Sequence, residues 1–173
     1  MEKLKLNVGS GEDYREGFIN IDIVDVSTEK NFIDLTAPDI LANVRFLPFK
    51  EEIFDEVFMS EVIEHIERQY MIPIFDEIWR VLKPGGEFYL SFPDFIECMK
   101  GFINNWHGAR WEGFAPTLYG RQAHKGDYHV NPVILQDTVT KLFNTGFGNL
   151  RHVVVPYDVQ ITCYKKKRLP TYL

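Results

Sequence analysis

The chain has 173 residues, of which 45% are hydrophobic and 14% aromatic, as is typical of a globular domain. This length fits one domain with a buried core, so we predict a single domain over residues 1–173. The net charge of -6 argues against a general nucleic-acid-binding surface, which needs a basic face. Cys98 and Cys163 lie far apart, which excludes a Cys-x-x-Cys zinc motif and a disulfide framework. With neither an apolar leader nor a stretch long enough to span a membrane, we expect a cytoplasmic protein.

Five apolar, largely non-alternating runs predict strands that are buried on both faces of a parallel sheet. These runs are residues 4–8, 19–23, 31–34, 54–60 and 87–92. The link between the first two runs has room for about one helical turn, so the first crossover helix is predicted to be shortened or missing. Sheet surface near the first strand is then less covered, and we expect another subunit or an unusual packing of the chain to cover it.

Two helices are predicted from apolar residues at three- and four-residue steps. The first has Pro73 in its first turn and ends at residues 83–86, Lys-Pro-Gly-Gly. Its apolar stripe consists of Met71, Ile74, Phe75, Ile78 and Leu82. The second begins at Asn131 and Pro132 and ends at Gly146. Its apolar face carries Leu135, Val139, Leu142 and Phe143.

The last two predicted strands, residues 150–155 and 159–164, are joined by a tight turn and should form an antiparallel hairpin. The alternation of strands and helices predicts an α/β fold. We expect a single Rossmann-like doubly wound sheet that is mostly parallel and ends in this hairpin.

A Gly-x-Gly turn at residues 9–11 ends the first predicted strand, and a carboxylate, Asp22, ends the second. Glycines here allow close approach of a ligand, and an acid after the next strand can bind a ribose. A dinucleotide fingerprint would need a third glycine where Tyr14 stands, and an acid about 20 residues further on. Asp22 follows Gly11 by only 11 residues. NAD is therefore disfavoured, and a nucleoside without a pyrophosphate, such as S-adenosylmethionine, is favoured.

Six motifs in order resemble those of the class I S-adenosylmethionine-dependent methyltransferases, in particular the small members. They are residues 6–11, 20–23, 32–35, 47–49 with 54–57, 60–65 and 77–86. The resemblance covers about residues 5–94 motif by motif and the rest of the chain more loosely. It implies S-adenosylmethionine as the cofactor and methyl transfer as the activity.

The resemblance also implies roles for single residues. The first motif, with Asn7, Gly9, Ser10 and Gly11, would wrap the methionine part of the cofactor, and Asp22 would receive the ribose hydroxyls. The family usually has an acid where this chain has Asn7, which puts the grip on the cofactor in question.

The remaining cofactor contacts are expected from the third motif and from the loop after the fourth strand. Asp34 and Leu35 would lie near the adenine, and Ser60, Glu61 and His65 follow the fourth strand. Because residues 37–46 look inserted, the adenine contact comes either from Asp34 or from residues 43–45.

The candidate catalytic residues are His65, Asp94 and His129. A general base is needed only when the acceptor would otherwise attack as a protonated oxygen or nitrogen. His65 is either such a base or a capping and packing histidine, and Asp94 is an acid at the strand mouth, the N-cap of the next helix, or both. The aromatic-rich residues 102–131, which include His129, are either a cap over the acceptor or an apolar cluster under a long loop.

The residues His124, Asp127 and His129 are spaced so that they could ligate a metal, but no anchoring cysteine or paired helical spacing supports this, so we expect no metal site. No Asn-Pro-Pro-Tyr follows the fourth strand, which disfavours a DNA-base methyltransferase. We therefore expect the acceptor to be a small molecule, a sugar or lipid-linked group, or a peptide side chain. The alternative is a non-catalytic S-adenosylmethionine-binding or scaffold protein, and a homo-oligomer is possible in either case.

Overall fold

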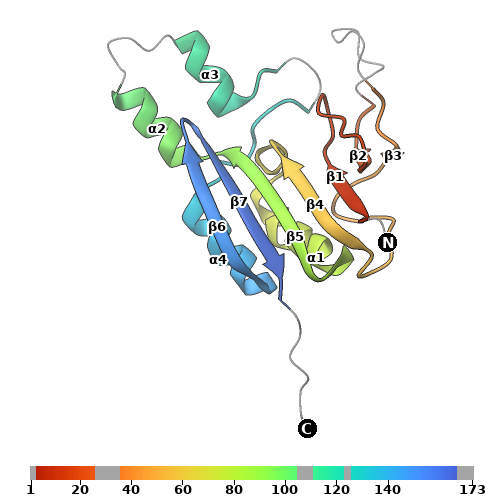
Figure 1. Cartoon of the computed structure of the whole chain (residues 1–173). Helices are drawn as coiled ribbons and strands as arrows, with labels where there is room; N and C mark the ends of the chain where they lie inside the picture. Colours follow the sequence, from red (N-terminus) through yellow and green to blue (C-terminus); the bar gives the residue numbers. More distant parts are fainter. Residues whose placement is uncertain (1–2, 26–35, 105–110, 123–125, 167–173) are drawn as a thin grey trace.

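The computed structural model of the chain describes residues 3–25, 36–104, 111–122 and 126–166. Seven strands form one sheet in the order β3-β2-β1-β4-β5-β7-β6 (Figure 1). The pairs from β3 to β5 are parallel, and β7 runs antiparallel to both β5 and β6. The strands are β1 (Lys5–Val8), β2 (Ile19–Asp22), β3 (Ile40–Leu41), β4 (Phe54–Ser60), β5 (Leu82–Pro93), β6 (Phe147–Val155) and β7 (Asp158–Lys165).

Within the described residues, two of the four α-helices pack on one face of this sheet. They are α1 (Met71–Val81) and α4 (Leu135–Thr145), which lie side by side behind β5, β6 and β7 (Figure 1). The other two, α2 (Phe95–Asn104) and α3 (Trp111–Tyr119), follow β5 and lie beyond its carboxyl end. The helices of the described chain therefore leave one sheet face and the carboxyl ends of β1, β2 and β4 uncovered.

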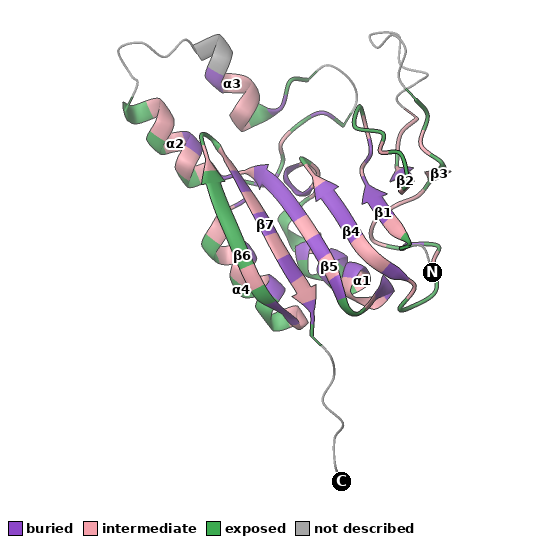
Figure 2. Cartoon of the chain, in the orientation of Figure 1, coloured by how far each residue is buried: buried purple, intermediate pink, exposed green. Residues whose placement is uncertain are grey.

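The core lies between the sheet and α1. Leu6, Val57 and Phe88 face the helix from neighbouring strands, and the predicted stripe of α1 contributes Phe75 and Ile78, all fully buried. Buried residues are concentrated in the central strands β1, β4 and β5 (Figure 2). Each such side chain contributes about 1.5–3 kcal/mol through burial. This core fixes the positions of the strand ends that carry the site.

No helix connects β1 to β2, as the sequence predicted. The loop itself packs on the open face of the sheet: the Arg15 guanidinium lies 3.4 Å from the centre of the Phe58 ring, and Phe18 packs edge-on against the same ring. Phe58 in turn stacks on Tyr89, with ring centres 4.5 Å apart. An unusual packing of the chain thus covers this patch, and a second subunit stays a prediction.

Several predicted elements are confirmed. The seven residues of β4 are those predicted, Pro73 lies in the first turn of α1, and the C-terminal strands form an antiparallel hairpin. Leu82, which was expected on this helix, instead begins β5. At Gly146, with φ of 114°, α4 ends in the left-handed conformation that favours glycine.

Other predictions were wrong in position. The helix predicted to begin at Asn131 is α4, which begins at Leu135. Asn131 is instead buried, and its side chain donates to the Ile63 carbonyl. Phe143, expected on its buried face, is exposed. The strand next to β2 is β3, inside the segment that looked inserted, whereas the predicted strand at residues 31–34 lies outside the described residues.

Both cysteines are buried and free. Across the described residues, the helices are all too short or too polar to cross a membrane.

Candidate functional site

A cavity of about 590 Å³ opens at the carboxyl ends of β1, β2 and β4. This volume is within the range of about 300–1,000 Å³ that small-molecule and cofactor sites occupy. Strand ends at one edge of a parallel sheet are the usual ligand-binding position in open α/β folds. The predicted cofactor residues that line it are Asn7, Gly9, Ser10, Gly11, Asp22, Ser60, Glu61 and His65.

The glycine turn forms the floor of this cavity next to β2. The backbone amides of Gly9 and Ser10 both donate to the Ile21 carbonyl, at 2.8 and 3.0 Å. Gly9 has a φ of 68°, and a Cβ at this position would lie 2.4 Å from Cγ2 of Val62. Both the backbone conformation and the close approach of the β4 loop therefore require glycine.

Asp22 is oriented by the backbone around it. Its Oδ2 accepts a hydrogen bond from the Gly11 amide and its Oδ1 accepts one from the Val24 amide, both at 2.9 Å. A carboxylate has about four acceptor positions, so two remain for other donors. The carboxylate lines the cavity and can accept the two hydroxyl groups of a ribose.

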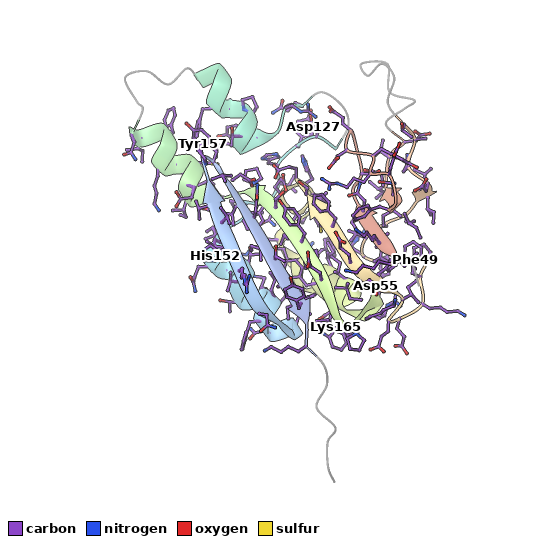
Figure 3. The ribbon with its side chains drawn as sticks, in the orientation of Figure 1. Phe49, Asp55, Asp127, His152, Tyr157 and Lys165 are labelled. Carbon is purple, nitrogen blue, oxygen red and sulfur yellow. The ribbon has the colours of Figure 1, made fainter. Side chains whose placement is uncertain are left out.

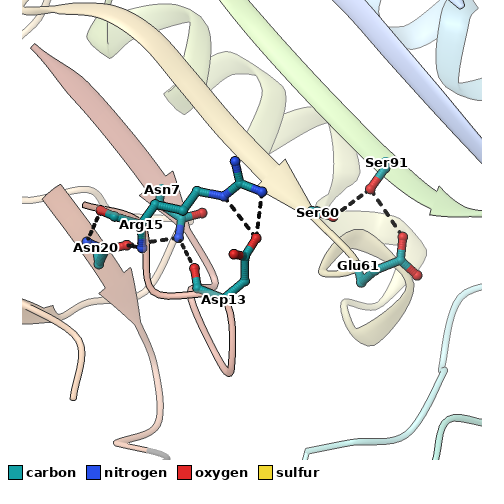
Figure 4. A network of polar contacts seen from close by, with 7 residues as sticks. All are labelled: Asn7, Asp13, Arg15, Asn20, Ser60, Glu61 and Ser91. Carbon is teal, nitrogen blue, oxygen red and sulfur yellow. Dashed lines mark hydrogen bonds and ion pairs between the residues drawn. The ribbon is translucent and has the colours of Figure 1, made fainter. Parts of the chain in front are cut away.

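Asn7 holds the loop that follows the glycine turn (Figure 4). Its amide nitrogen donates to the Asp13 carbonyl at 2.7 Å and to Oδ1 of Asn20 at 2.9 Å. The orientation of the Asn20 amide is fixed, because its nitrogen faces the carbonyls of Arg15 and Phe18 and its oxygen accepts from the Arg15 amide. Both partners of Asn7 are acceptors, so a donor is needed where the family usually has an acid.

Of the two predicted sources for an adenine contact, the structure describes one. Residues 43–45 line the cavity beside β2, where the Ala42 amide donates to the Asp22 carbonyl. The Arg45 guanidinium lies 4.3 Å from the centre of the Tyr70 ring, and both residues line the cavity. Asp34 and Leu35 lie outside the described residues.

The ends of β4 and β5 are linked by a chain of polar side chains at the cavity (Figure 4). The hydroxyls of Ser60 and Ser91 are 2.7 Å apart, and Ser91 also donates to the Glu61 carboxylate at 3.2 Å. Burial raises the pKa of Glu61 to about 7, the charge of Asp158 adds to the rise, and the Ser91 hydrogen bond lowers it. Glu61 has a positive φ of 53°, which turns the chain sharply out of β4.

Next along the chain, Glu64 and His65 form part of the short 3₁₀ turn η2 (Ile63–His65). His65 and His129 lie edge to face with ring centres 4.8 Å apart, although 64 residues separate them in the chain. Glu64 is only 1% exposed, and beyond a contact with the carboxyl group of Glu61 its oxygens have no hydrogen-bond partner among the described residues. Burial raises the pKa of Glu64 well above its usual range, and the charge of Glu61 raises it further.

Asp94 lies at the start of two helices and does not line the cavity. One of its oxygens accepts from the Glu97 amide at 2.9 Å, capping α2, and the other accepts from the Leu135 amide at 2.6 Å, capping α4. This matches the N-cap alternative that the sequence left open. A catalytic role of Asp94 stays a prediction.

The described part of the aromatic-rich segment forms one wall of the cavity. Arg121 pairs with Glu12 of the glycine-rich loop at 2.5 Å, which links this segment to the rim of the cavity. Asp127, labelled in Figure 3, also lines the cavity. Gly120 allows the backbone at Asp127 to pack closely against it, since a Cβ on residue 120 would lie 2.2 Å from the Asp127 carbonyl oxygen. His124 of the metal trio weighed in the sequence lies outside the described residues.

Sequence reasoning missed Glu64 and the Glu12–Arg121 pair. Both depend on contacts between segments that are distant in the chain, so a local pattern carries no signal for them. Glu64 stands beside His65 in the motif at residues 60–65, but its burial next to His129 depends on the fold.

A family model described as a methyltransferase domain matches residues 6–90. Among solved structures, the chain is similar to a SAM-dependent methyltransferase from Archaeoglobus fulgidus, with a TM-score of 0.66, 13% identity and coverage of 94% of this chain and 86% of that one. It is also similar to a SAM-dependent methyltransferase from Methanosarcina mazei, with a TM-score of 0.63, 16% identity and coverage of 95% and 93%. A protein from Pyrococcus horikoshii OT3 gives a TM-score of 0.61 at 20% identity, with coverage of 96% and 83%. No curated protein matches the chain.

Proposed function

Since the chain belongs to the class I S-adenosylmethionine-dependent methyltransferase family, we propose that it is an active enzyme that transfers the methyl group of S-adenosylmethionine to a small molecule, a sugar or a peptide side chain. The observation that carries this proposal is the cavity at the strand ends, with Asp22 at one end and the β4 loop at the other. The cofactor itself follows from the family.

In this proposal, Asp22 accepts hydrogen bonds from the ribose hydroxyls, and the amide-rich turn of Gly9, Ser10 and Gly11 lies against the methionine part of the cofactor. Asn7 supports the loop after the turn through its amide nitrogen, and it carries no charge that could pair with the cofactor ammonium. Residues 43–45 contact the adenine, with Asp34 and Leu35 kept as the alternative source.

Methyl transfer is an in-line displacement, so the protein acts chiefly by holding the nucleophile, the methyl carbon and the sulfur in line. We place the acceptor at the other end of the cavity, near Ser60, Glu61 and His65, where Arg121, Asp127 and Val130 also line it. His65 and His129 are the candidates to contact the acceptor. Asp94 has a positioning role in this proposal, since its carboxylate caps two helices.

The net charge of -6 supports an acceptor other than nucleic acid. The two free buried cysteines suit a reducing compartment, and we keep the cytoplasm, a single domain over residues 1–173 and a possible homo-oligomer as parts of the proposal.

The test is transfer of label from methyl-labelled S-adenosylmethionine to fractions of a cell extract, with Asp22→Asn as the matched inactive variant. We expect wild-type protein to label at least one fraction and the variant to label it at least tenfold less. Cofactor binding without transfer to any small-molecule, glycan or peptide fraction would instead support a non-catalytic binding protein.

A further inference from the structure

A compact group of three metal-ligand side chains lies in the wall of the cofactor cavity. One carboxylate oxygen of Glu64 and one ring nitrogen each of His65 and His129 lie within 4.8 Å of one another. Nitrogen and carboxylate donors of this kind are the usual ligands of Zn²⁺ and other divalent transition metals. From the sequence we expected no metal site, because the trio weighed there, His124, Asp127 and His129, has neither an anchoring cysteine nor paired helical spacing.

The two histidines are oriented as metal ligands usually are. Nδ1 of His65 lies 3.1 Å from the Tyr128 carbonyl, and Nδ1 of His129 lies 3.1 Å from the Thr117 carbonyl. A carbonyl only accepts, so in each neutral ring the proton is on Nδ1 and the lone pair is on Nε2. A backbone carbonyl behind the ring is the common way in which proteins fix the tautomer of a ligating histidine.

Glu64 provides the independent observation. Its side chain is 2% exposed, and beyond a contact with the carboxyl group of Glu61 its two oxygens have no hydrogen-bond partner in the described chain, which is costly for a buried carboxylate. Its Oε1 lies 4.0 Å from Nε2 of His65. The nearby carboxylates of Glu61 and Asp158 interact electrostatically with Glu64 and make this place still more favourable for a cation.

We propose that Glu64, His65 and His129 bind one divalent transition-metal ion such as Zn²⁺. With ligand bonds of about 2.0–2.1 Å, tetrahedral ligand atoms lie about 3.4 Å apart, so each donor atom must move inward by no more than about 0.8 Å. Three protein ligands leave a fourth position for water or substrate, as in catalytic metal sites.

The location of the proposed metal site suggests what would occupy the fourth coordination position. His65 lines the large cavity, while Glu64 and His129 line a second cavity of about 220 Å³, and Val130 lines both. The ion would therefore lie in the wall between the two cavities. Here the inference rests on the proposed function: the ion would bind an oxygen of the acceptor, a hydroxyl or carboxylate, next to the cofactor.

The test is titration of the whole metal-free protein with Co²⁺, followed by its visible absorption, in the absence of cofactor. We expect one tightly bound ion per chain, with the intense absorption of a four-coordinate site, and displacement by Zn²⁺. Glu64→Gln and His129→Gln should each weaken binding at least about 100-fold. His152→Gln, which changes an exposed histidine on β6, is the matched control and should leave binding unchanged (Figure 3).

Glu64→Gln has the shape of the protonated acid, so the variant should fold, and circular dichroism checks this. Co²⁺ binding that is as tight in both ligand variants as in wild type, or absent in wild type, overturns the metal site. Calorimetry with S-adenosylhomocysteine separates this result from the proposed function: absent nucleoside binding refutes the function and leaves the Co²⁺ result standing.

Discussion

Replacing Asn7 with aspartate puts back the acid that the family usually has at this position, and the structure predicts that the change is harmful. The Asn7 amide nitrogen donates to two acceptors, the Asp13 carbonyl and Oδ1 of Asn20, and the residue is 2% exposed. An aspartate offers no donor when ionised, so the Asp13 carbonyl loses this hydrogen bond, Asn20 Oδ1 keeps only the Arg15 amide, and a charge is buried beside them.

Each lost hydrogen bond, together with the repulsion between the buried charge and the acceptor it faces, costs about 1–3 kcal/mol, so Asn7→Asp should lower the free energy of unfolding by about 2–6 kcal/mol at neutral pH. With a urea dependence of about 2 kcal/mol per M, the unfolding midpoint falls by about 1–3 M. Burial also raises the folded-state pKa of the new acid above its unfolded value of about 3.9. Its stability contribution is therefore greatest below that pH and is lost as pH rises, so the deficit should be larger at pH 8 than at pH 5.

The assay is urea unfolding followed by circular dichroism at both pH values, together with calorimetry using S-adenosylhomocysteine. The matched control is Asn43→Asp, which lies in the same cavity but uses its oxygen, accepting from the Arg45 amide at 3.0 Å. Aspartate keeps that bond, and we expect the free energy of unfolding to change by no more than about 0.5 kcal/mol. If the free energy of unfolding of Asn7→Asp lies within about 0.5 kcal/mol of the wild-type value and the variant binds the nucleoside more tightly, the assigned loop contacts are wrong.

Three further predictions follow from single contacts. Gly9→Ala should weaken S-adenosylhomocysteine binding at least tenfold in calorimetry, because the new Cβ would clash with Val62. A second change, Val62→Ala, should recover part of the lost affinity. Full affinity in the single variant would contradict the close approach of the two residues. Asp94→Ala should cost about 2 kcal/mol in urea unfolding through two lost helix caps, while nucleoside affinity changes less than threefold; a large affinity loss at unchanged stability would instead support a direct role. Burial raises the pKa of Cys98 and Cys163 to about 12, so both thiols should react slowly with a disulfide reagent at pH 8 until denaturant is added, and complete reaction within minutes in the native protein would contradict their burial.

The elements that local pattern determines were predictable from the sequence. The buried run of residues 54–60 and the stripe of α1 are set by apolar spacing, and Gly146 ends α4 because it accepts a positive φ. The start of α4 was not predictable in this way. Asn131 had the chemistry of an N-cap, but its side chain donates to the Ile63 carbonyl, and the carboxylate of Asp94, far away in the chain, caps the helix instead.

The same division applies to the site. Gly9 and Asp22 were predicted because a turn and a strand end carry their own sequence signals, and the structure brings both to the cavity. The structural role of Asn7 as a hydrogen-bond donor could not be predicted from the sequence, because it depends on the orientation of the Asn20 amide. The grouping of Glu64 with His65 and His129 depends on where a distant loop returns, which only the fold determines.

The most direct test of the central claim is calorimetry of the wild-type protein with S-adenosylhomocysteine and with NAD, repeated with Asp22→Asn. The exposed Asp76→Asn on α1 removes the same charge away from the cavity and serves as the control. We expect micromolar binding of S-adenosylhomocysteine, no binding of NAD, and at least tenfold weaker nucleoside binding in Asp22→Asn alone, about 1.4 kcal/mol or more. Binding of NAD without the sulfur nucleoside, or nucleoside affinity unaffected by Asp22→Asn, would contradict the account.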